Sequence, residues 1–354
     1  MKRVLIMAGG TGGHVFPGLA IAKALAEEGV ETVWLGTHDG MEQTWVQPTG
    51  IPFYRISIKG VRGNGWLGWL AAPFRVTRAW WQARKILLET QPDLVLGMGG
   101  FVCGPGGLAA WSLGKKLVLH EQNAIPGMTN KWLAPLAKRV ICAFPQSVLR
   151  GSNVVTLGNP VRAGLESLSC VLPQTPRRLL VMGGSRGALA LNQVVPAALA
   201  LLPINERPQV CHQTGEKTLS QAQEAYAAAG VDATVTPFID DMVQAYQAAD
   251  LVICRSGALT VSELLAAARP AILVPYPHAV DDHQTANAQA LVEIGGGEVI
   301  QQSALTAETL AERLRFWMDS ETCQAASRAI RAQAPQAATQ RILAELKRIV
   351  ASDV

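Results

Sequence analysis

The 354-residue sequence has no apolar run long enough to span a lipid bilayer. Its longest apolar stretch, Trp66–Phe74, holds about nine residues and includes Gly and Pro, whereas a transmembrane helix needs roughly 20. At the N-terminus, Lys2 and Arg3 precede about five apolar residues, fewer than the roughly 7–15 of a secretory signal. We therefore expect the chain to begin with a β-strand and the protein to stay in the cytoplasm.

Cysteine is scarce, and several metal and nucleotide motifs are absent. The six cysteines are scattered without a Cys-x-x-Cys pair, so we expect reduced thiols, no disulfides and no zinc site. The sequence contains no D-x-D, no H-E-x-x-H and no G-x-x-x-x-G-K-[ST]. These absences argue against a metal-dependent sugar transferase, a zinc protease and a P-loop enzyme. We expect neither a metal nor a cofactor.

Charged residues are few and unevenly distributed. They make up 16% of the chain and hydrophobic residues 49%, a composition that excludes a disordered protein. Residues 1–160 carry 16 basic and 8 acidic side chains, a net charge of +8, whereas residues 161–354 carry 15 and 19, a net charge of −4. The length and this asymmetry predict two domains, one basic and one mildly acidic.

No acidic residue lies between Glu42 and Glu89, a stretch with seven Lys or Arg and five of the nine tryptophans. Cations beside Trp and Leu suit the headgroup layer of an anionic membrane, and we expect Gly63–Gly68 to be a Gly-rich loop. A pair of helices with Trp80 and Trp81 in the core is the alternative. No nucleic-acid motif is present, so we expect no nucleic-acid partner. The candidate membrane residues are Arg62, Trp66, Leu67, Trp69 and Arg75.

Short apolar runs alternate with stretches of helical periodicity along the whole chain. Continuous apolar strands separated by helices predict parallel sheets that are covered on both faces. The expected strands are Arg3–Met7, Thr32–Leu35, Leu94–Met98, Leu117–His120, Arg139–Cys142, Leu179–Met182, Gln209–His212, Thr234–Thr236, Leu251–Cys254 and Ala271–Val274. The expected helices include Gly18–Glu28, Ala188–Leu202, Thr218–Ala229, Val261–Ala268 and Ala337–Val350.

Two Gly-rich loops repeat one local pattern. Residues 7–13 read MAGGTGG and residues 182–188 read MGGSRGA, each between an expected strand and a helix, and neither fits G-x-G-x-x-G. Glycines let the backbone approach a ligand, and the N–H groups of a helix start attract anions, although such a loop can also be a plain tight turn. The repeat predicts two similar doubly wound domains with a border near Gly158-Asn159-Pro160.

The segment Phe238–Pro270 carries the most specific pattern. An expected strand ends at Cys254, Ser256-Gly257 form a turn, and a helix begins near Ala258. The first N–H groups of that helix can hold a diphosphate. Glu263, about one turn into the helix, can accept hydrogen bonds from ribose hydroxyls, or it can serve only as a capping-box carboxylate.

Six motifs together carry a family resemblance. MAGGTGGHVFPGLA, GMGGFVCGPGGLAAW, HEQNAIPG, GNPVR, GGSRGA and CRSGALTVSE resemble the MurG-type glycosyltransferases, from about residue 3 to the C-terminus. The resemblance implies an α/β protein with the GT-B fold, in which two Rossmann-like doubly wound parallel-sheet domains face a cleft. It also implies an inverting transfer of GlcNAc from UDP-GlcNAc to the C4 hydroxyl of MurNAc in lipid I, which gives lipid II for peptidoglycan, cell shape and cell division.

The resemblance further implies a place and partners for the protein. These are UDP-GlcNAc, lipid I, the anionic cytoplasmic face of the inner membrane as a peripheral contact, and other cell-wall synthesis proteins. In that family the N-terminal domain faces the acceptor and the membrane, here residues 1–160 with a C-terminal helix at 336–354. The donor domain is then 161–335. The charge asymmetry of the two halves agrees with this division.

The resemblance also implies a donor site, residue by residue. Ile239 meets uracil through its backbone, Glu263 binds ribose, and Ser185, Arg162 and the amides of Ala258 and Leu259 hold the diphosphate. Gln284 contacts the sugar, and Thr260, Val261 and Ser262 complete the helix start. From the N-terminal half, the sugar is reached by Thr11, Gly12, Gly13 and Asn123.

An inverting displacement needs a base for the acceptor hydroxyl. His14 at the start of the first helix is our candidate, and Glu121, which can instead orient Asn123, is the alternative.

Three positions depart from the family pattern, namely Arg186 in place of Gln, Phe101 in place of Tyr, and His283 in place of Gln. A second possible function is a UDP-sugar-binding protein or epimerase without a lipid acceptor, against which the Trp-rich basic stretch argues.

Overall fold

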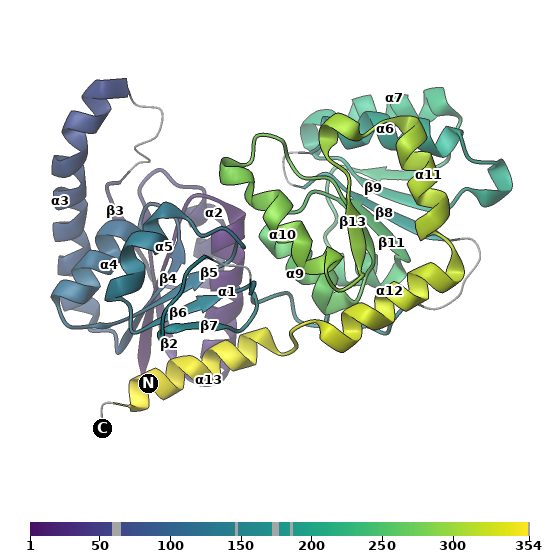
Figure 1. The fold of residues 1–354 in the computed structure, drawn as a ribbon. Helices are drawn as coiled ribbons and strands as arrows, with labels where there is room; N and C mark the ends of the chain where they lie inside the picture. The colour runs from purple at the N-terminus through teal and green to yellow at the C-terminus, as the bar shows by residue number, and fades with distance from the viewer. Residues whose placement is uncertain (59–64, 146–147, 172–176, 185–186, 353–354) are drawn as a thin grey trace. The chain divides into compact units, whose positions relative to one another are not determined.

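The computed structural model describes residues 1–58, 65–145, 148–171, 177–184 and 187–352, with the backbone alone for 65–72 and 280. The chain divides into two compact units (Figure 1). Unit 1 comprises Met1–Val161 and Ala337–Val354, and unit 2 comprises Arg162–Gln336. The last helix of the chain therefore returns to the unit that contains the N-terminus.

Unit 1 is built on a parallel sheet with the strand order β3-β2-β1-β4-β5-β6-β7. Its strands are β1 (Arg3–Ala8), β2 (Glu31–Thr37), β3 (Phe53–Ile56), β4 (Leu94–Gly99), β5 (Lys116–Glu121), β6 (Arg139–Cys142) and β7 (Val154–Thr156). Its helices are α1 (Gly12–Glu27), α2 (Glu42–Val46), α3 (Gly65–Thr90), α4 (Cys103–Ser112), α5 (Met128–Leu133) and α13 (Ala338–Ala351), with 3-10 turns at Gln47–Thr49 and Ala134–Leu136.

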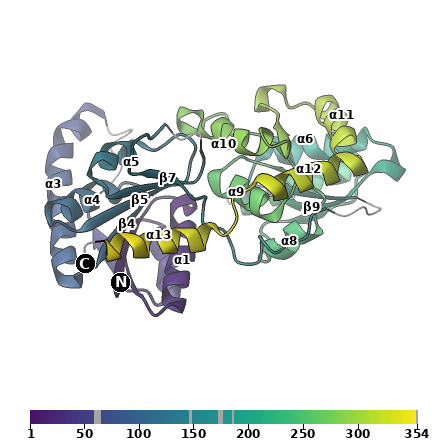
Figure 2. The ribbon, with the colours of Figure 1, turned by 60° about the horizontal axis from the view of Figure 1, so that its bottom comes forward.

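Alternating side chains of β1 show how the sheet of unit 1 is covered on both faces. Val4 and Ile6 pack in a cluster with α1 and with Ile342 of α13, while Leu5 and Met7 pack in a second cluster with α3, α4 and α5. Figures 1 and 2 show α13 lying beside α1, and α3 beside α4. Two-sided burial explains why the central strands are continuously apolar.

Unit 2 repeats the architecture with the strand order β10-β9-β8-β11-β12-β13, again parallel throughout. Its strands are β8 (Arg178–Met182), β9 (Gln209–Gln213), β10 (Thr234–Thr236), β11 (Leu251–Cys254), β12 (Ala271–Leu273) and β13 (Gly297–Val299). Its helices are α6 (Leu189–Ala200), α7 (Leu219–Ala229), α8 (Met242–Ala248), α9 (Ala258–Ala267), α10 (His283–Val292), α11 (Ala307–Trp317) and α12 (Ser320–Gln333), with 3-10 turns at Ile204–Glu206, Glu216–Thr218, Val280–Asp282 and Gln302–Ala304.

In both sheets the direction in which the chain adds strands reverses beside the first strand. In unit 1 the chain adds β2 and β3 on one side of β1 and then continues with β4 on the other side. In unit 2 the same reversal falls between β8 and β11. Open parallel sheets bind ligands beyond the carboxyl ends of the strands at such a switch point. The loops after β1, β4, β8 and β11 are therefore where a ligand is expected.

The predicted architecture is confirmed, and its local errors have physical causes. All ten expected strands are present within two residues. The strands β3, β7 and β13 were missed, and each lies at the edge of its sheet and is only partly buried, so it lacks a continuous apolar run. The first helix begins at Gly12, not Gly18, because Thr11 already starts it after the glycine turn. The expected loop Gly63–Gly68 is wrong from Gly65 onward, since α3 begins there. One long helix also replaces the alternative helix pair.

Over the described residues, no helix combines the length and apolarity that crossing a membrane requires.

Candidate functional site

The first glycine loop connects β1 to α1 and is held from two sides. Thr11 is the N-cap of α1, and its carbonyl accepts hydrogen bonds from His14 N at 3.1 Å and Val15 N at 3.3 Å. The buried carboxylate of Glu42 accepts from Gly10 N at 3.3 Å and from Thr37 N at 2.7 Å. Glu42 thereby ties the loop to the end of β2, a role that its position in the sequence did not reveal.

Two glycines at the end of β4 make room for this loop. Gly99 and Gly100 have φ angles of +110° and +87°, in the left-handed region that favours glycine. A side chain at Gly99 would place its Cβ 2.6 Å from Nδ1 of His14, and one at Gly100 would meet the carbonyl of Gly9 at 2.3 Å. The GMGG motif is therefore needed so that the loops after β1 and β4 can pack against each other.

The two base candidates have different surroundings. His14 is half-buried, and its Nδ1 lies 2.9 Å from Oε1 of Gln122. Glu121 is buried, and its oxygens accept hydrogen bonds from Asn123 N at 3.0 Å, Gly127 N at 3.0 Å and Asn130 Nδ2 at 2.9 Å. The Glu121 carboxylate thus fixes the loop that follows β5, and this environment favours His14 as the group that meets a substrate proton.

In unit 2 the start of α9 offers backbone donors after β11. Gly257 is the N-cap and provides no side-chain cap, and the first helical hydrogen bond runs from Val261 N to Gly257 O at 3.0 Å. The N–H groups of Ala258, Leu259 and Thr260 precede that bond, so they can bind an anion.

Side chains around this helix start have distinct environments. The Ser256 hydroxyl is buried and has no hydrogen-bond partner among the described residues. Val261 is fully buried, and Ser262 donates to Ala258 O at 2.8 Å, so these two side chains stabilise the helix itself. Ser256, which the motif-based assignment omitted, is therefore a further candidate contact.

Glu263 lies in a buried ionic network. Its Oε1 accepts from Nε of Arg162 at 2.8 Å, and its Oε2 accepts from the hydroxyl of Tyr246 at 3.2 Å. Its side chain is 6% exposed, and that of Arg162 is 45% exposed. Burial raises the pKa of Glu263, while the guanidinium of Arg162 opposes this. The capping-box alternative is not what the structure contains, because the first turn of α9 has no side-chain cap.

Further side chains tie the loops of unit 2 to one another. Gln284 accepts from Tyr276 N at 2.9 Å through its Oε1, and Asn287 Nδ2 donates to Ser256 O at 3.3 Å. Gln213 accepts from Gly184 N at 3.0 Å and donates to Pro237 O at 3.0 Å. The second glycine loop is thereby connected to the segment before α8, which contains the half-buried Ile239. The candidates Ser185 and Arg186 lie outside the described residues.

The membrane candidates are only partly described. Arg75 is exposed, Arg62 lies outside the described residues, and Trp66, Leu67 and Trp69 belong to α3 without described side chains. Trp80 is half-buried against the core whereas Trp81 is 60% exposed. Other large apolar side chains are exposed on α3, α4 and α5, and the sequence analysis did not single them out: Phe74, Leu88, Leu108, Trp111, Met128 and Trp132.

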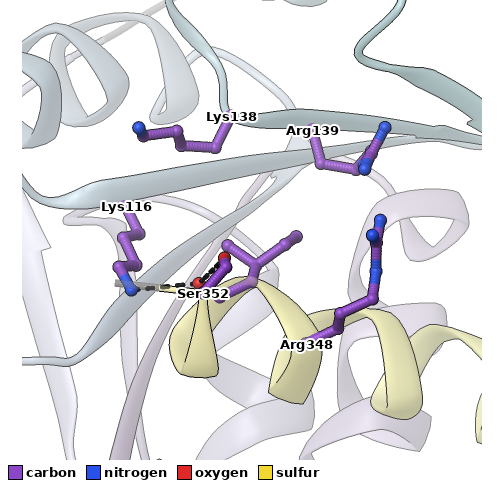
Figure 3. Close-up of a pocket in the computed structure, with 6 residues that line it drawn as sticks. Lys116, Lys138, Arg139, Arg348 and Ser352 are labelled. Carbon is purple, nitrogen blue, oxygen red and sulfur yellow. Dashed lines mark hydrogen bonds between the residues drawn. The ribbon is translucent and has the colours of Figure 1, made fainter. Parts of the chain in front are cut away.

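A basic pocket in unit 1 lies away from the loops that follow the carboxyl ends of the strands (Figure 3). Lys116 and Arg139 are the first residues of β5 and β6, so the pocket is at the amino ends of the strands. Lys116 donates to the carbonyls of Ile349 at 3.0 Å and Val350 at 2.9 Å, and Arg139 pairs with Glu345 at 2.6 Å. These cations hold the C-terminal end of α13 against the sheet, and they are not part of the candidate site.

The described residues contain no cluster of His, Cys, Asp and Glu that could hold a metal ion. Unit 1 instead offers an imidazole beside the first glycine loop, and unit 2 by itself offers an anion-accepting helix start and a buried carboxylate. The groups of unit 2 are suited to binding a phosphate-containing molecule. The imidazole of unit 1 is suited to accepting a proton from a hydroxyl.

Family comparisons identify the chemistry more closely. Residues 4–142 match the glycosyltransferase family 28 N-terminal domain, and residues 178–342 match the glycosyltransferase family 28 C-terminal domain. The chain belongs to glycosyltransferase family 28. The family resemblance stated from the motifs is thus confirmed, together with the fold of two Rossmann-like parallel-sheet units.

Individual members of family 28 are similar over the full length. A protein of Hydrogenovibrio crunogenus, 68% identical over 354 residues with all of both chains covered, is named UDP-N-acetylglucosamine–N-acetylmuramyl-(pentapeptide) pyrophosphoryl-undecaprenol N-acetylglucosamine transferase. The crystal structure of Acinetobacter baumannii MurG superposes with a TM-score of 0.86 at 40% identity, and the match covers 98% of this chain and 100% of that one.

A more distant neighbour shares the fold alone. A putative UDP-N-acetylglucosamine 2-epimerase from Listeria monocytogenes superposes with a TM-score of 0.67 at 15% identity, over 98% of this chain and 96% of that one. At this identity the likeness says nothing about the reaction, so it lends no support to the epimerase alternative.

Proposed function

We propose that this family 28 glycosyltransferase transfers GlcNAc from UDP-GlcNAc to the C4 hydroxyl of MurNAc in lipid I, and so forms lipid II. The observation that carries the proposal is full-length similarity to a relative named for this transfer. The position of the motifs supports it, because the glycine loops, the HEQN segment and the start of α9 all lie at carboxyl ends of strands. The anomeric configuration inverts, because the acceptor oxygen attacks from the face opposite to the departing UDP.

Unit 2 binds the donor in this proposal. The N–H groups of Ala258 and Leu259 at the start of α9 meet the diphosphate, with Ser185 from the second glycine loop. Glu263 accepts from the ribose hydroxyls, since a carboxylate has more acceptor positions than the two that Arg162 and Tyr246 occupy. Arg162, nearly half exposed, adds positive charge close to the phosphates.

Contacts with uracil and with the GlcNAc sugar complete the donor site. Uracil is met by the backbone of Ile239. Because the amide oxygen of Gln284 already accepts from Tyr276 N, Gln284 contacts the GlcNAc hydroxyls through its Nε2 donors. Unit 1 reaches the sugar through its first glycine loop, with Thr11, Gly12 and Gly13, and through Asn123.

His14 acts as the base, and backbone amides stabilise the leaving group. The C4 hydroxyl gives its proton to the imidazole, its oxygen forms the bond to the anomeric carbon, and the bond from that carbon to the diphosphate oxygen breaks. The electron pair of that bond departs with UDP, whose added charge is met by the α9 amides and Arg162. Base catalysis of this kind contributes roughly 10²–10⁴ to a rate.

A lipid-linked acceptor requires contact with the membrane that holds it. Several exposed aromatic side chains of unit 1 lie on α3, α4 and α5, where α3 contacts α4 and α4 contacts α5. Trp81, Trp111 and Trp132 are 60%, 55% and 75% exposed, and exposed cations of α3 include Arg75, Arg78 and Lys85. Such a face suits peripheral binding to anionic lipid headgroups, here at the cytoplasmic side of the inner membrane.

The direct test is a turnover assay that pairs UDP-GlcNAc with a short-chain lipid I analogue. The proposal expects a product heavier by one GlcNAc, β-linked at C4 of MurNAc, together with one UDP per product. UDP-GlcNAc consumed without a lipid-linked disaccharide, or epimerised to another UDP-sugar, would instead favour the second function considered from the sequence.

A further inference from the structure

Four groups in unit 1 form one continuous hydrogen-bonded chain that ends at His14. The carbonyl of Gly158 lies 3.0 Å from Nε2 of His120, and Nδ1 of His120 lies 3.0 Å from Nε2 of Gln122. Oε1 of Gln122 lies 2.9 Å from Nδ1 of His14. His120 and Gln122 are 0% and 1% exposed, so water does not compete for these bonds.

The direction of every bond follows from its fixed end. A backbone carbonyl only accepts, so Nε2 of His120 carries a hydrogen and donates it to Gly158. Burial lowers the pKa of His120 to about 4, so at neutral pH this ring is uncharged and its Nδ1 is an acceptor. The amide nitrogen of Gln122 therefore faces His120 and donates to Nδ1.

A second contact fixes the same amide orientation. The Gln122 Nε2 also donates to the backbone carbonyl of His120 at 3.3 Å, so two acceptors face the nitrogen end of the side chain. The oxygen end must then face His14, where it can only accept. His14 consequently donates from Nδ1, and in the neutral ring the lone pair is left on Nε2.

We propose that His120 and Gln122 are positioning residues that hold His14 in the tautomer with hydrogen on Nδ1 and the basic lone pair on Nε2. The inference rests on the proposed function, in which His14 accepts the proton of the acceptor hydroxyl. When Nε2 takes that proton, the Nδ1 hydrogen stays in its bond to Gln122, so no proton moves along the chain. An amide fixes the tautomer without placing a negative charge beside the ring.

Neighbouring groups hold this series of hydrogen bonds in place. His120 is in β5 and Gln122 follows it by two residues, so both side chains lie on the same side of the extended backbone. Asn159 Nδ2 donates to the carbonyl of Gln122 at 3.2 Å, which anchors its backbone beside Gly158. The glycine at position 99 leaves space for the His14 ring.

The tautomer can be measured without substrate. Two-bond ¹H–¹⁵N spectra of the full-length protein labelled with ¹⁵N-histidine distinguish the two tautomers, and a His14→Gln variant assigns the His14 signals. In the neutral ring we expect the hydrogen on Nδ1. Gln122→Met, which keeps the side-chain length but removes the acceptor, should shift His14 towards a mixture of tautomers.

Two further variants sharpen the comparison. Gln122→Glu keeps an acceptor facing His14 but loses the donor to His120, so it should retain the wild-type tautomer of His14 while lowering stability. Gln82→Met removes another partly buried amide of unit 1, one that accepts from Ser57 N, and should leave both the tautomer and kcat unchanged. A wild-type His14 with hydrogen on Nε2, or a Gln122→Met spectrum identical to the wild type, would overturn the proposal.

Measuring kcat and KM distinguishes a positioning role of Gln122 from a merely structural one. Gln122→Met should lower kcat roughly tenfold or more while the KM for UDP-GlcNAc stays within about twofold, since the base is misoriented but the donor site is intact. An active wild type whose Gln122→Met variant keeps the full kcat would contradict the positioning role. A wild type without turnover would count against the proposed function alone, because the spectrum reports the tautomer independently.

Discussion

Nε of Arg162 lies 2.8 Å from Oε1 of Glu263, so two residues assigned to different parts of a donor molecule contact each other directly. The pair joins the start of unit 2 to the first turns of α9. Glu263 is nearly buried and Arg162 is not. The carboxylate therefore depends on the guanidinium for compensation, whereas the guanidinium can also reach water.

Replacing either partner should affect donor binding, and the two changes should differ in stability. Glu263→Gln should raise the KM for UDP-GlcNAc about 10- to 100-fold, the equivalent of about 1.5–3 kcal/mol for a hydrogen bond to a charged group. Arg162→Gln should destabilise unit 2 more than Glu263→Gln does, because it leaves a buried carboxylate without a cation. Steady-state kinetics and urea unfolding test both. An unchanged donor KM in folded Glu263→Gln would remove Glu263 from the ribose site.

His14→Ala should lower kcat by roughly 10²-fold or more, with UDP affinity measured by calorimetry little changed. Glu121→Gln should act mainly on stability, since one amide nitrogen would face donors that now bind a carboxylate, namely Asn123 N, Gly127 N and Asn130 Nδ2. A His14→Ala enzyme within about threefold of the wild-type kcat, beside a folded but inactive Glu121→Gln enzyme, would reverse the assignment of the base.

The exposed aromatic face of unit 1 should bind vesicles rich in anionic lipid, bind zwitterionic vesicles weakly, and release at high salt. Replacing Trp81, Trp111 and Trp132 with Ser and Arg75 with Gln should reduce flotation with vesicles while UDP affinity is retained. The matched control replaces Ile204 and Phe316 with Ser, which are 82% and 49% exposed in unit 2. Equal binding by the unit 1 variant and the wild type would show that this face does not contact the membrane.

Acid should destabilise both units through buried neutral histidines. Burial lowers the pKa of His120 to about 4 and that of His212 to about 3, compared with 6.5 in an unfolded chain. Below pH 6.5 the unfolded chain binds protons that the folded chain excludes, so stability is lost as the pH falls towards these values. Each residue should contribute a loss of about 2 kcal/mol between pH 7 and pH 5.

His212→Gln offers a specific check of this pH dependence, because glutamine can keep a hydrogen bond to the hydroxyl of Tyr226, the present partner of His212. The free energy of unfolding in urea should fall less between pH 7 and pH 5 than in the wild type. His278→Gln, at an exposed position, should behave like the wild type. The same acid loss in His212→Gln as in the wild type would contradict the role of the buried ring.

Local sequence determined most of the scaffold. Strands such as β1 and β11 are continuously apolar because both faces of their sheets are covered, and glycine turns mark where strand passes into helix. The same local character explains the errors. The start of α3 reads as a Gly-rich loop, and short strands such as β13 lack a long apolar run.

The family, the fold and the helix start at Ala258 could be predicted from motifs, because each motif is a contiguous run with its own turn chemistry. The pairing of side chains could not. His14 and Gln122 are 108 positions apart, and Arg162 and Glu263 are 101 apart. Parallel strands gather their carboxyl ends at one edge of a sheet, so only the tertiary structure decides which polar groups meet there, which oxygen accepts, and which nitrogen keeps its lone pair.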